Sequence, residues 1–276
     1  AGGGRRARGD RTVRGRCRAG RLEEEEQGEE RRAGSTRAPS SSLPATSHAG
    51  YSYCGHVMAH AYAAVAAAAP ATTRVLLLGP SHKVATRAAH LSSAAAYATP
   101  LGDLVVDTDT IAALRATGEF DGMDASTDAA EHSLELHAPW LAHVFAGRLS
   151  EVTLVPIMVG ALDAAKEAAV ASALAPLLAD ARTLAVVSTD FCHYGARFGY
   201  TPAFDAPTVA AAIEALDREG IALVEAGSAP AWRAYLARTG NTVCGRYPVS
   251  LLLATAAALA AGGGPRVQAR FLAYGQ

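Results

Sequence analysis

Residues 184–195 read LAVVSTDFCHYG and join an apolar run to a polar, titratable cluster. The run from Leu184 to Val187 predicts a buried β-strand that ends in Ser-Thr-Asp. His193 follows three residues after Asp190. Because α/β proteins bind ligands at the carboxyl ends of their sheet strands, this stretch predicts one part of a functional site.

Strand and helix patterns alternate along the chain on both sides of this stretch. Arg74 to Leu78 and Val152 to Val159 have the apolar runs of buried strands, and short strands are expected within 88–106. This alternation predicts a single α/β domain at 48–276 with a mixed or parallel sheet. We expect helices at about 55–69, 107–117, 131–145, 163–180, 206–226, 229–239 and 248–261, a polar loop at 122–130, and a terminal strand at 267–274.

Residues 1–47 differ in composition from the rest of the chain. They contain an Arg- and Gly-rich stretch, a Glu/Arg run and a Ser/Thr/Pro/Ala-rich stretch. None of these has the periodicity of a packed element, so we predict a disordered extension. A transit peptide, a basic nucleic-acid arm and a faulty gene model are the alternatives, and the acidic run argues against the first.

The overall composition narrows the class of protein. The formal net charge of -1 gives no general reason to expect a nucleic acid or an anionic membrane as partner. No apolar run reaches the roughly 18 residues that a membrane span requires. None of the four cysteines forms a CxxC pair, and no secretory segment precedes the domain, so we expect a reducing compartment and a cytoplasmic protein.

Histidines and one cysteine recur at predicted element boundaries. His48 opens a Gly-containing turn, His82 and His193 follow strands, and His132 begins a helix. Cys244 directly precedes a predicted helix. A thiol at a helix N-terminus ionises more easily, and a thiolate is a good ligand for Cu(I), Zn(II) or iron. Each residue alone could be an ordinary boundary side chain or packing residue. Their convergence at one sheet edge instead predicts a metal or substrate site.

Two pairs of titratable residues have the i, i+3 spacing that places side chains on one face of a turn or helix. Asp190 beside His193 would suit a general base or the support of a metal ligand, or would form only a local salt bridge or N-cap. His132 and Glu135 repeat the spacing on a predicted helix, where the alternative is a solvated face. Glu131 and His137 are expected to point away from the face that His132 and Glu135 share.

Three further side chains are candidates for lining a pocket. Arg246 at the start of a predicted helix could bind an anionic group or pair with a carboxylate. Tyr51 and Tyr194 lie close to histidines in the sequence, so they could line the pocket or pack in the core.

Seven segments of the chain resemble the MEMO family (mediator of ErbB2-driven cell motility) and its bacterial and archaeal relatives, in the family's order and spacing. They cover most of 48–276, which makes the resemblance specific. The segments are HAGYSYCG at 48–55, LLLGPSH at 76–82, TPLGDLVVD at 99–107, EHSLELHAPWL at 131–141, LVPIMVGAL at 154–162, VVSTDFCHYGARFGY at 186–200 and TVCGRYPVSLLL at 242–253.

The resemblance implies a fold similar to class III extradiol dioxygenases, with a central mixed sheet and helices on both sides. It implies a pocket formed by His48, His82 and Cys244, with Asp190 and His193 beside them. A cysteine in place of a carboxylate makes the site softer. The resemblance implies that the site binds copper or iron, as the family is associated with these metals, and a redox-linked function is expected.

Two other functions stay open on the same resemblance. One is an adaptor that binds phosphotyrosine peptides or another protein partner in signalling and cell motility, with Arg246 and the aromatic residues as contacts. The other is an active non-haem iron dioxygenase, whose carboxylate ligand would be Glu135 or Asp190.

The chain departs from the family pattern at both ends of the resemblance. Residues 40–47 lack a strand's hydrophobic pattern, so we expect the strand before His48 to be missing or replaced, and His193 to take over as ligand if His48 is displaced. The family also continues beyond the segment that ends at Gln276. A misjoined or incomplete gene model and true divergence are the two explanations.

Overall fold

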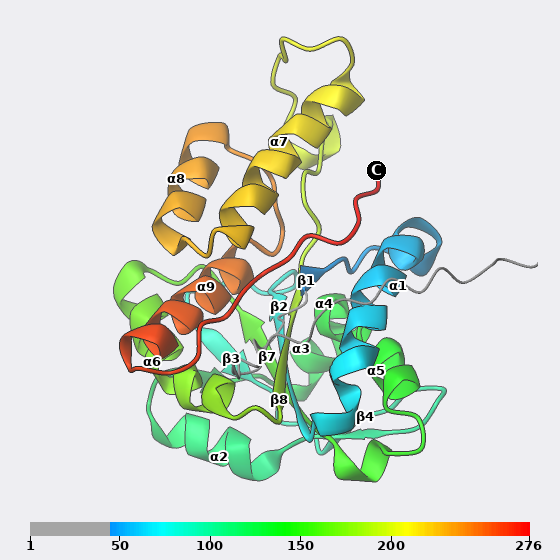
Figure 1. Ribbon diagram of the computed structural model, residues 1–276, viewed down its shortest axis with the longest axis vertical. Coiled ribbons are helices and arrows are strands. Elements are labelled where there is room, and N and C mark those ends of the chain that lie inside the picture. Colours follow the sequence, from blue (N-terminus) through cyan, green and yellow to red (C-terminus); the bar gives the residue numbers. More distant parts are fainter. Residues whose placement is uncertain (1–44) are drawn as a thin grey trace, which may run out of the picture. The chain divides into compact units, whose positions relative to one another are not determined.

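The computed structural model describes residues 45–276, and Figure 1 shows their strands and helices. The extension predicted at 1–47 lies outside the described residues except for its last three. Those three include a short strand, so regular structure begins before His48. No helix of the described residues is long and apolar enough to cross a membrane.

A six-stranded mixed sheet forms the centre of this domain, as predicted. Four strands run parallel, then one runs antiparallel to its neighbour, and the edge strand is parallel to that one. Their order across the sheet is β1 (Ala45–Thr46), β8 (Thr183–Ser188), β2 (Arg74–Pro80), β7 (Thr153–Val159), β3 (Ala89–Leu91) and β6 (Phe120–Gly122). β4 (Ala96–Tyr97) and β5 (Leu104–Val105) form a separate antiparallel pair.

The central strands are apolar throughout because both faces of the sheet are covered. In β2, Leu76 and Leu78 belong to one core cluster, whereas Val75 and Leu77 belong to the other. A strand with alternate side chains in two cores needs an unbroken apolar run. This requirement explains why β2, β7 and β8 were recognisable from sequence.

Helices cover both faces of the sheet, as Figure 1 shows for α1 and α5 on one side and for α6 and α9 on the other. One face is covered by α1 (Tyr51–Ala68), α4 (His132–Glu135) and α5 (Ala138–Val144). The other is covered by α2 (Thr108–Ala116), α6 (Ala164–Ala179), α8 (Ala229–Thr239) and α9 (Arg246–Ala261), with α7 (Val209–Glu225) packed through partly buried residues. Asp107 and Asp163 cap α2 and α6 through their side chains, at the predicted helix starts.

Three predicted elements are wrong. The polar loop at 122–130 contains a short helix, α3 (Ala125–Ala130), whose N-terminus is capped by the Asp124 carboxylate. The helix predicted at 131–145 was expected to continue with a bend at Pro139. It is instead two helices that separate at His137, with Pro139 in the first turn of the second. The predicted terminal strand is absent from 267–274. That segment is held instead by side chains, such as the Tyr274 hydroxyl that donates to Asp217 at 3.0 Å.

The strand before His48 is present, so the prediction that it is missing or replaced is wrong. Ala45 and Thr46 pair in parallel with Val187 and Ser188 of β8, and the Thr189 amide donates to the Thr46 carbonyl at 2.9 Å. Two residues are too few for a hydrophobic pattern to appear in the sequence. The pairing nevertheless delivers His48 to the carboxyl end of β8.

A candidate metal centre at the carboxyl ends of the strands

His48 lies directly after β1, at the centre of the predicted cluster. Its amide donates to the Asp190 carboxylate at 3.0 Å, and Asp190 also accepts from the Ser47 hydroxyl. Its ring nitrogen Nδ1 lies 2.5 Å from the Ser188 hydroxyl, and Nε2 lies 3.0 Å from the Cys244 sulfur. These contacts fix the orientation of the ring, with Nε2 turned towards Cys244.

The His48 ring is only 2% exposed. Burial lowers its pKa to about 4, although the neighbouring Asp190 carboxylate acts in the opposite direction. The ring is therefore neutral near pH 7, which is the form that can bind a metal.

A buried network continues from His48 into the core. The Ser188 hydroxyl lies 2.9 Å from Nε2 of His137, and Nδ1 of His137 lies 2.7 Å from the Tyr62 hydroxyl. His137 is fully buried, and burial lowers its pKa to about 3. Ser188, His137 and Tyr62 thus connect the candidate centre to the α1 side of the core, and we call these three residues the inner network.

His82 follows β2 and is held by Glu131. The Glu131 carboxylate accepts from the His82 amide at 2.7 Å and lies 2.9 Å from Nδ1 of its ring. Gly79 makes this arrangement possible, because a Cβ there would lie 2.5 Å from the Ser133 hydroxyl. The glycine of the GPSH segment therefore allows α4 to approach the end of β2.

Glu131 is ionised although it is fully buried. Burial raises the pKa of its carboxyl. The hydrogen bonds from the His82 ring, the His82 amide and the Ser133 amide lower the pKa by more than burial raises it, so the net value is about 2. A carboxylate on Nδ1 of a histidine orients the ring and strengthens the opposite nitrogen as a ligand. His82 therefore presents Nε2 as its open nitrogen.

Cys244 completes the cluster from the turn before α9. Its amide donates to the Asp190 carbonyl at 3.2 Å, and the Asp190 amide donates to its sulfur at 3.1 Å. A Cβ on Gly245 would lie 2.2 Å from Thr189, so only glycine lets this turn approach the end of β8 so closely. Burial and the Asp190 charge raise the pKa of the thiol to about 12, which keeps it protonated unless a cation binds.

Asp190 and His193 lie beside this cluster, with Oδ2 and Nε2 4.0 Å apart. The His193 ring is held on its other side by the Thr242 carbonyl, 3.0 Å from Nδ1. Burial raises the pKa of Asp190, but His48 and other neighbours lower it overall. The predicted i, i+3 pair thus forms, with a charged carboxylate next to the open nitrogen of His193.

Three overlapping groups of side chains have ligand atoms within 4.8 Å of one another. The first is the predicted set of His48, His82 and Cys244. The second adds Glu131 and His132 around His82, and the third joins Asp190 and His193 to Cys244. The donor set fits a metal. In each of His48, His82 and His193, Nδ1 lies within hydrogen-bond distance of a protein oxygen, which leaves Nε2 as the nitrogen that could bind an ion.

Comparison with known proteins identifies the family. The model of the Memo-like protein family matches residues 40–276. The chain belongs to the Memo-like family. Protein MEMO1 of Xenopus laevis is 39% identical over 219 residues, which cover 79% of this chain and 73% of that protein.

Two other relatives give similar values. Protein MEMO1 of Homo sapiens is 39% identical over 196 residues, 71% of this chain and 65% of that protein. The memo-1 homolog of Caenorhabditis elegans is 37% identical over 219 residues, 78% of this chain and 62% of its own length.

Of the remaining predicted pocket residues of this Memo-like chain, some lie at the site and others lie outside it. His132 is at the site, with its ring 4.4 Å from that of His82, but its nearest carboxylate is Glu131 at 3.7 Å rather than Glu135. Glu135 is exposed and belongs to none of the three ligand groups. Tyr51 donates to the Leu136 carbonyl at 2.7 Å, and Tyr194 packs against Phe204.

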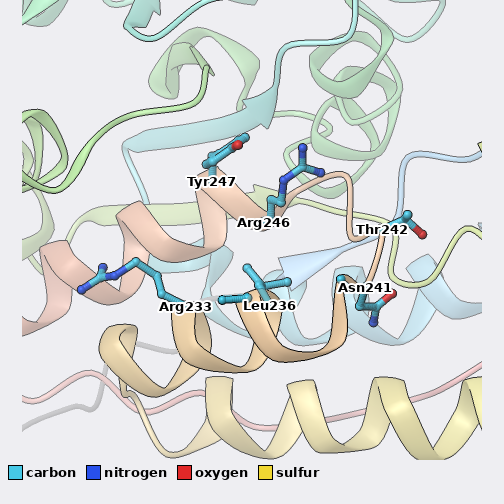
Figure 2. Close-up of a pocket in the computed structure, with 8 residues that line it drawn as sticks. Arg233, Leu236, Asn241, Thr242, Arg246 and Tyr247 are labelled. Atoms are coloured by element: carbon cyan, nitrogen blue, oxygen red, sulfur yellow. The ribbon is translucent and has the colours of Figure 1, made fainter. Parts of the chain in front are cut away.

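Arg246 lines a separate hollow, although its charge also acts on the Cys244 thiol, whose pKa it lowers. Its guanidinium donates to the Val243 carbonyl at 3.0 Å and stacks on Tyr247. Figure 2 shows this hollow, about 440 Å³ in volume, which is also lined by Arg233, Leu236, Asn241 and Thr242.

Four residues of the centre were missed or misjudged from sequence. Glu131 and His137 were expected to point elsewhere, which is wrong, because the break between α3 and α4 and the second break at His137 turn both side chains inward. Ser188 and Tyr62 carried no separate signal. Glu131 and His137 also had no separate signal, because the EHSLELH segment is polar at five of its seven positions.

Proposed function

We propose that this Memo-like protein holds a copper or iron ion between His48, His82 and Cys244. The observation that carries the proposal is the closeness of their donor atoms, which lie within 4.8 Å of one another. Thiolate with imidazole is a donor set suited to Cu(I), zinc or iron. A bound copper or iron ion would supply one-electron redox chemistry at the sheet edge.

The surrounding residues have supporting functions in this proposal. Glu131 orients His82 through Nδ1, and Ser188 does the same for His48. Asp190 stays charged beside Cys244 and so favours a cation. The backbone N–H of Asp190 donates a hydrogen bond to the Cys244 sulfur, which stabilises a thiolate. His193 offers a further nitrogen next to Asp190 for proton transfer or as a replacement ligand.

Metal content of purified protein tests the proposal. The His82→Ala, Cys244→Ala double variant should lose the ion that the wild type retains, as measured by mass spectrometry after desalting. The matched control is His90→Ala, Cys192→Ala, because both residues lie outside the ligand groups. Equal metal content in the wild type and the first variant would overturn the proposal.

A second candidate function is recognition of a phosphotyrosine peptide at the hollow in Figure 2. Two arginines line it, and α9 begins there after Gly245, which supplies no capping side chain. Arg233 pairs with Glu167, whereas Arg246 has no carboxylate partner among residues 45–276. An anionic group could therefore bind beside Arg246 as an adaptor contact.

Fluorescence anisotropy with a phosphotyrosine peptide and its unphosphorylated form tests this second function. Arg246→Gln should weaken binding of the phosphorylated form by about tenfold, for one lost charged contact. Arg197→Gln is the control, because Arg197 lies on the Phe198 ring away from the hollow. Equal binding of the two peptides removes the proposal.

An active dioxygenase is the weaker alternative, since Glu135 lies outside the ligand groups and leaves Asp190 as the nearby carboxylate from the original pair. A catechol-cleavage assay on iron-loaded protein tests it.

We place the protein in the cytoplasm, because Cys54, Cys192 and Cys244 are all free thiols, which is typical of reducing compartments.

A further inference from the structure

The inner network has a hydroxyl at each of two points, Ser188 and Tyr62, and two arrangements of its hydrogen atoms use the Ser188 proton in a bond to one of the rings. Ser188 has one hydroxyl proton and two partners, Nδ1 of His48 and Nε2 of His137. If Ser188 accepted from both rings, its own buried proton would be left unpaired, so the favoured state has it donating to one ring and accepting from the other. With one proton on each ring, the direction at Ser188 then fixes the tautomer of each.

In the first arrangement every hydrogen bond runs outward, towards the candidate centre. The Tyr62 hydroxyl donates to Nδ1 of His137, whose Nε2–H donates to Ser188. Ser188 then donates to Nδ1 of His48, and Nε2–H of His48 points at the Cys244 sulfur. Each donor has an acceptor in this outward arrangement.

In the second arrangement every bond runs inward. Nδ1–H of His48 donates to Ser188, Ser188 donates to His137, and Nδ1–H of His137 donates to the Tyr62 oxygen. The Tyr62 proton then has no acceptor, because His137 is the only hydrogen-bond partner of that hydroxyl among the described residues. Tyr62 is 2% exposed, so its hydroxyl is shielded from bulk water and a donor left unpaired there is costly.

We propose that the buried Tyr62 hydroxyl sets the tautomer of His48 and thereby lowers the metal affinity of the centre. The ion needs the lone pair on Nε2 of His48, which only the inward arrangement provides. The outward arrangement is the more stable one without an ion, since it leaves no buried donor unpaired. Tyr62 and His137 are thus positioning residues that act through Ser188. The effect on affinity rests on the proposed metal site, whereas the effect on the tautomer does not.

The Tyr62→Phe variant tests the inference. Without the hydroxyl, each arrangement leaves Nδ1 of His137 unpaired, as a lone pair in the outward one and as an N–H in the inward one, so the outward arrangement loses its advantage of having every donor paired. Histidine ¹⁵N NMR of metal-stripped wild type should show His48 protonated on Nε2 and His137 unprotonated on Nδ1. In the variant, His48 should shift towards the Nδ1–H tautomer. With Co(II) alone as probe, the thiolate charge-transfer band should report binding about tenfold tighter than in the wild type.

The matched control is Tyr97→Phe, which removes a partly buried tyrosine hydroxyl that is bonded to Asp128 and not to the inner network. It should change neither the His48 tautomer nor the Co(II) affinity. A wild-type His48 protonated on Nδ1 overturns the inference even if the variant does not fold. Unchanged or weaker Co(II) binding in a folded Tyr62→Phe variant overturns it as well. If no form of the protein binds Co(II), the proposed metal site fails, and the tautomer measurement still decides the hydrogen-bond direction.

Discussion

His48 and His82 present their Nε2 atoms to the same centre, but the protein holds their Nδ1 atoms in different ways. Behind His82 is a charged carboxylate, Glu131, which also accepts two backbone amides. Behind His48 is a neutral hydroxyl, Ser188, which belongs to the inner network. The His48 ring is 2% exposed, whereas the His82 side chain is 26% exposed.

The difference teaches how rigid each ligand is. An ionised carboxylate can only accept, so Glu131 keeps the proton of His82 on Nδ1 and Nε2 open. A hydroxyl can donate or accept, so Ser188 allows both tautomers of His48. We therefore expect His82 to be a fixed ligand and His48 to be an adjustable one.

Acid should have the largest effect on stability, and it should act on the His48 side first. The pKa of His137 is about 3 in the folded protein against an ordinary value of 6.5. Between pH 6.5 and about 3, His137 binds a proton in the unfolded chain but not in the folded protein. The free energy of unfolding should therefore fall by about 1.4 kcal/mol per pH unit for this residue, and by about 4 kcal/mol in all by pH 3.

The Glu131 side should lose stability only at lower pH. Its pKa is about 2 against 4.5, so its contribution is present above pH 4.5 and is lost between 4.5 and about 2. Urea unfolding of metal-stripped protein at stepped pH measures both windows. A His137→Gln variant should show a shallower decline below pH 6.5, and an unchanged slope would contradict the assignment.

Glu131→Gln should have the next largest effect. An amide cannot accept from the His82 amide, the His82 ring and the Ser133 amide together, so one buried donor would face another. We expect a loss of about 3 kcal/mol in urea unfolding and a ten- to hundredfold weaker Co(II) affinity. Glu135→Gln, on the exposed face of the same helix, should change neither. Equal effects of the two substitutions would show that Glu131 does not hold His82.

Ser188→Ala should have a smaller effect on stability, of about 2 kcal/mol, since it leaves two neutral ring nitrogens unpaired rather than a charge. Thermal unfolding measures this loss. Ser250→Ala is the control, because Ser250 is also buried but its hydroxyl accepts only a long bond from Arg233, at 3.4 Å. A loss as large as that of Glu131→Gln would remove the contrast between the two ligands.

His132→Gln should have the smallest effect. Its side chain is 42% exposed and makes no hydrogen bond, although its ring lies near those of His48 and His82. Stability should change by less than about 0.5 kcal/mol, and Co(II) affinity by less than about threefold. A tenfold loss would instead place His132 among the ligands.

The fold could be predicted wherever local sequence and tertiary packing make the same demand. β2 and β8 are apolar because both their faces are buried, so a short window of sequence shows them. α2 and α6 begin at aspartates whose side chains cap them. In contrast, α3 is short and polar, and β1 exists only because β8 offers it a partner.

The grouping of His48, His82 and Cys244 could be predicted from sequence, but the residues that hold them could not. His48, His82 and Cys244 stand at element boundaries, where local sequence marks them. Glu131 is bonded to His82 across 49 residues of chain, and Ser188 to His48 across 140. No spacing rule encodes contacts of that range. The i, i+3 rule paired His132 with Glu135, whereas the fold paired His82 with Glu131.

The position of β1 has a consequence for how quickly an ion could leave. Among residues 45–276, β1 is one of the two edge strands of the central sheet, and its described part is two residues long. Edge segments with few backbone hydrogen bonds open far more often than the core does. His48 therefore lies on the part of the sheet that frays first, and amide hydrogen exchange at 46–48 should be faster than in β2. Ion release would then follow the opening rate of this short strand rather than the strength of the metal bonds alone.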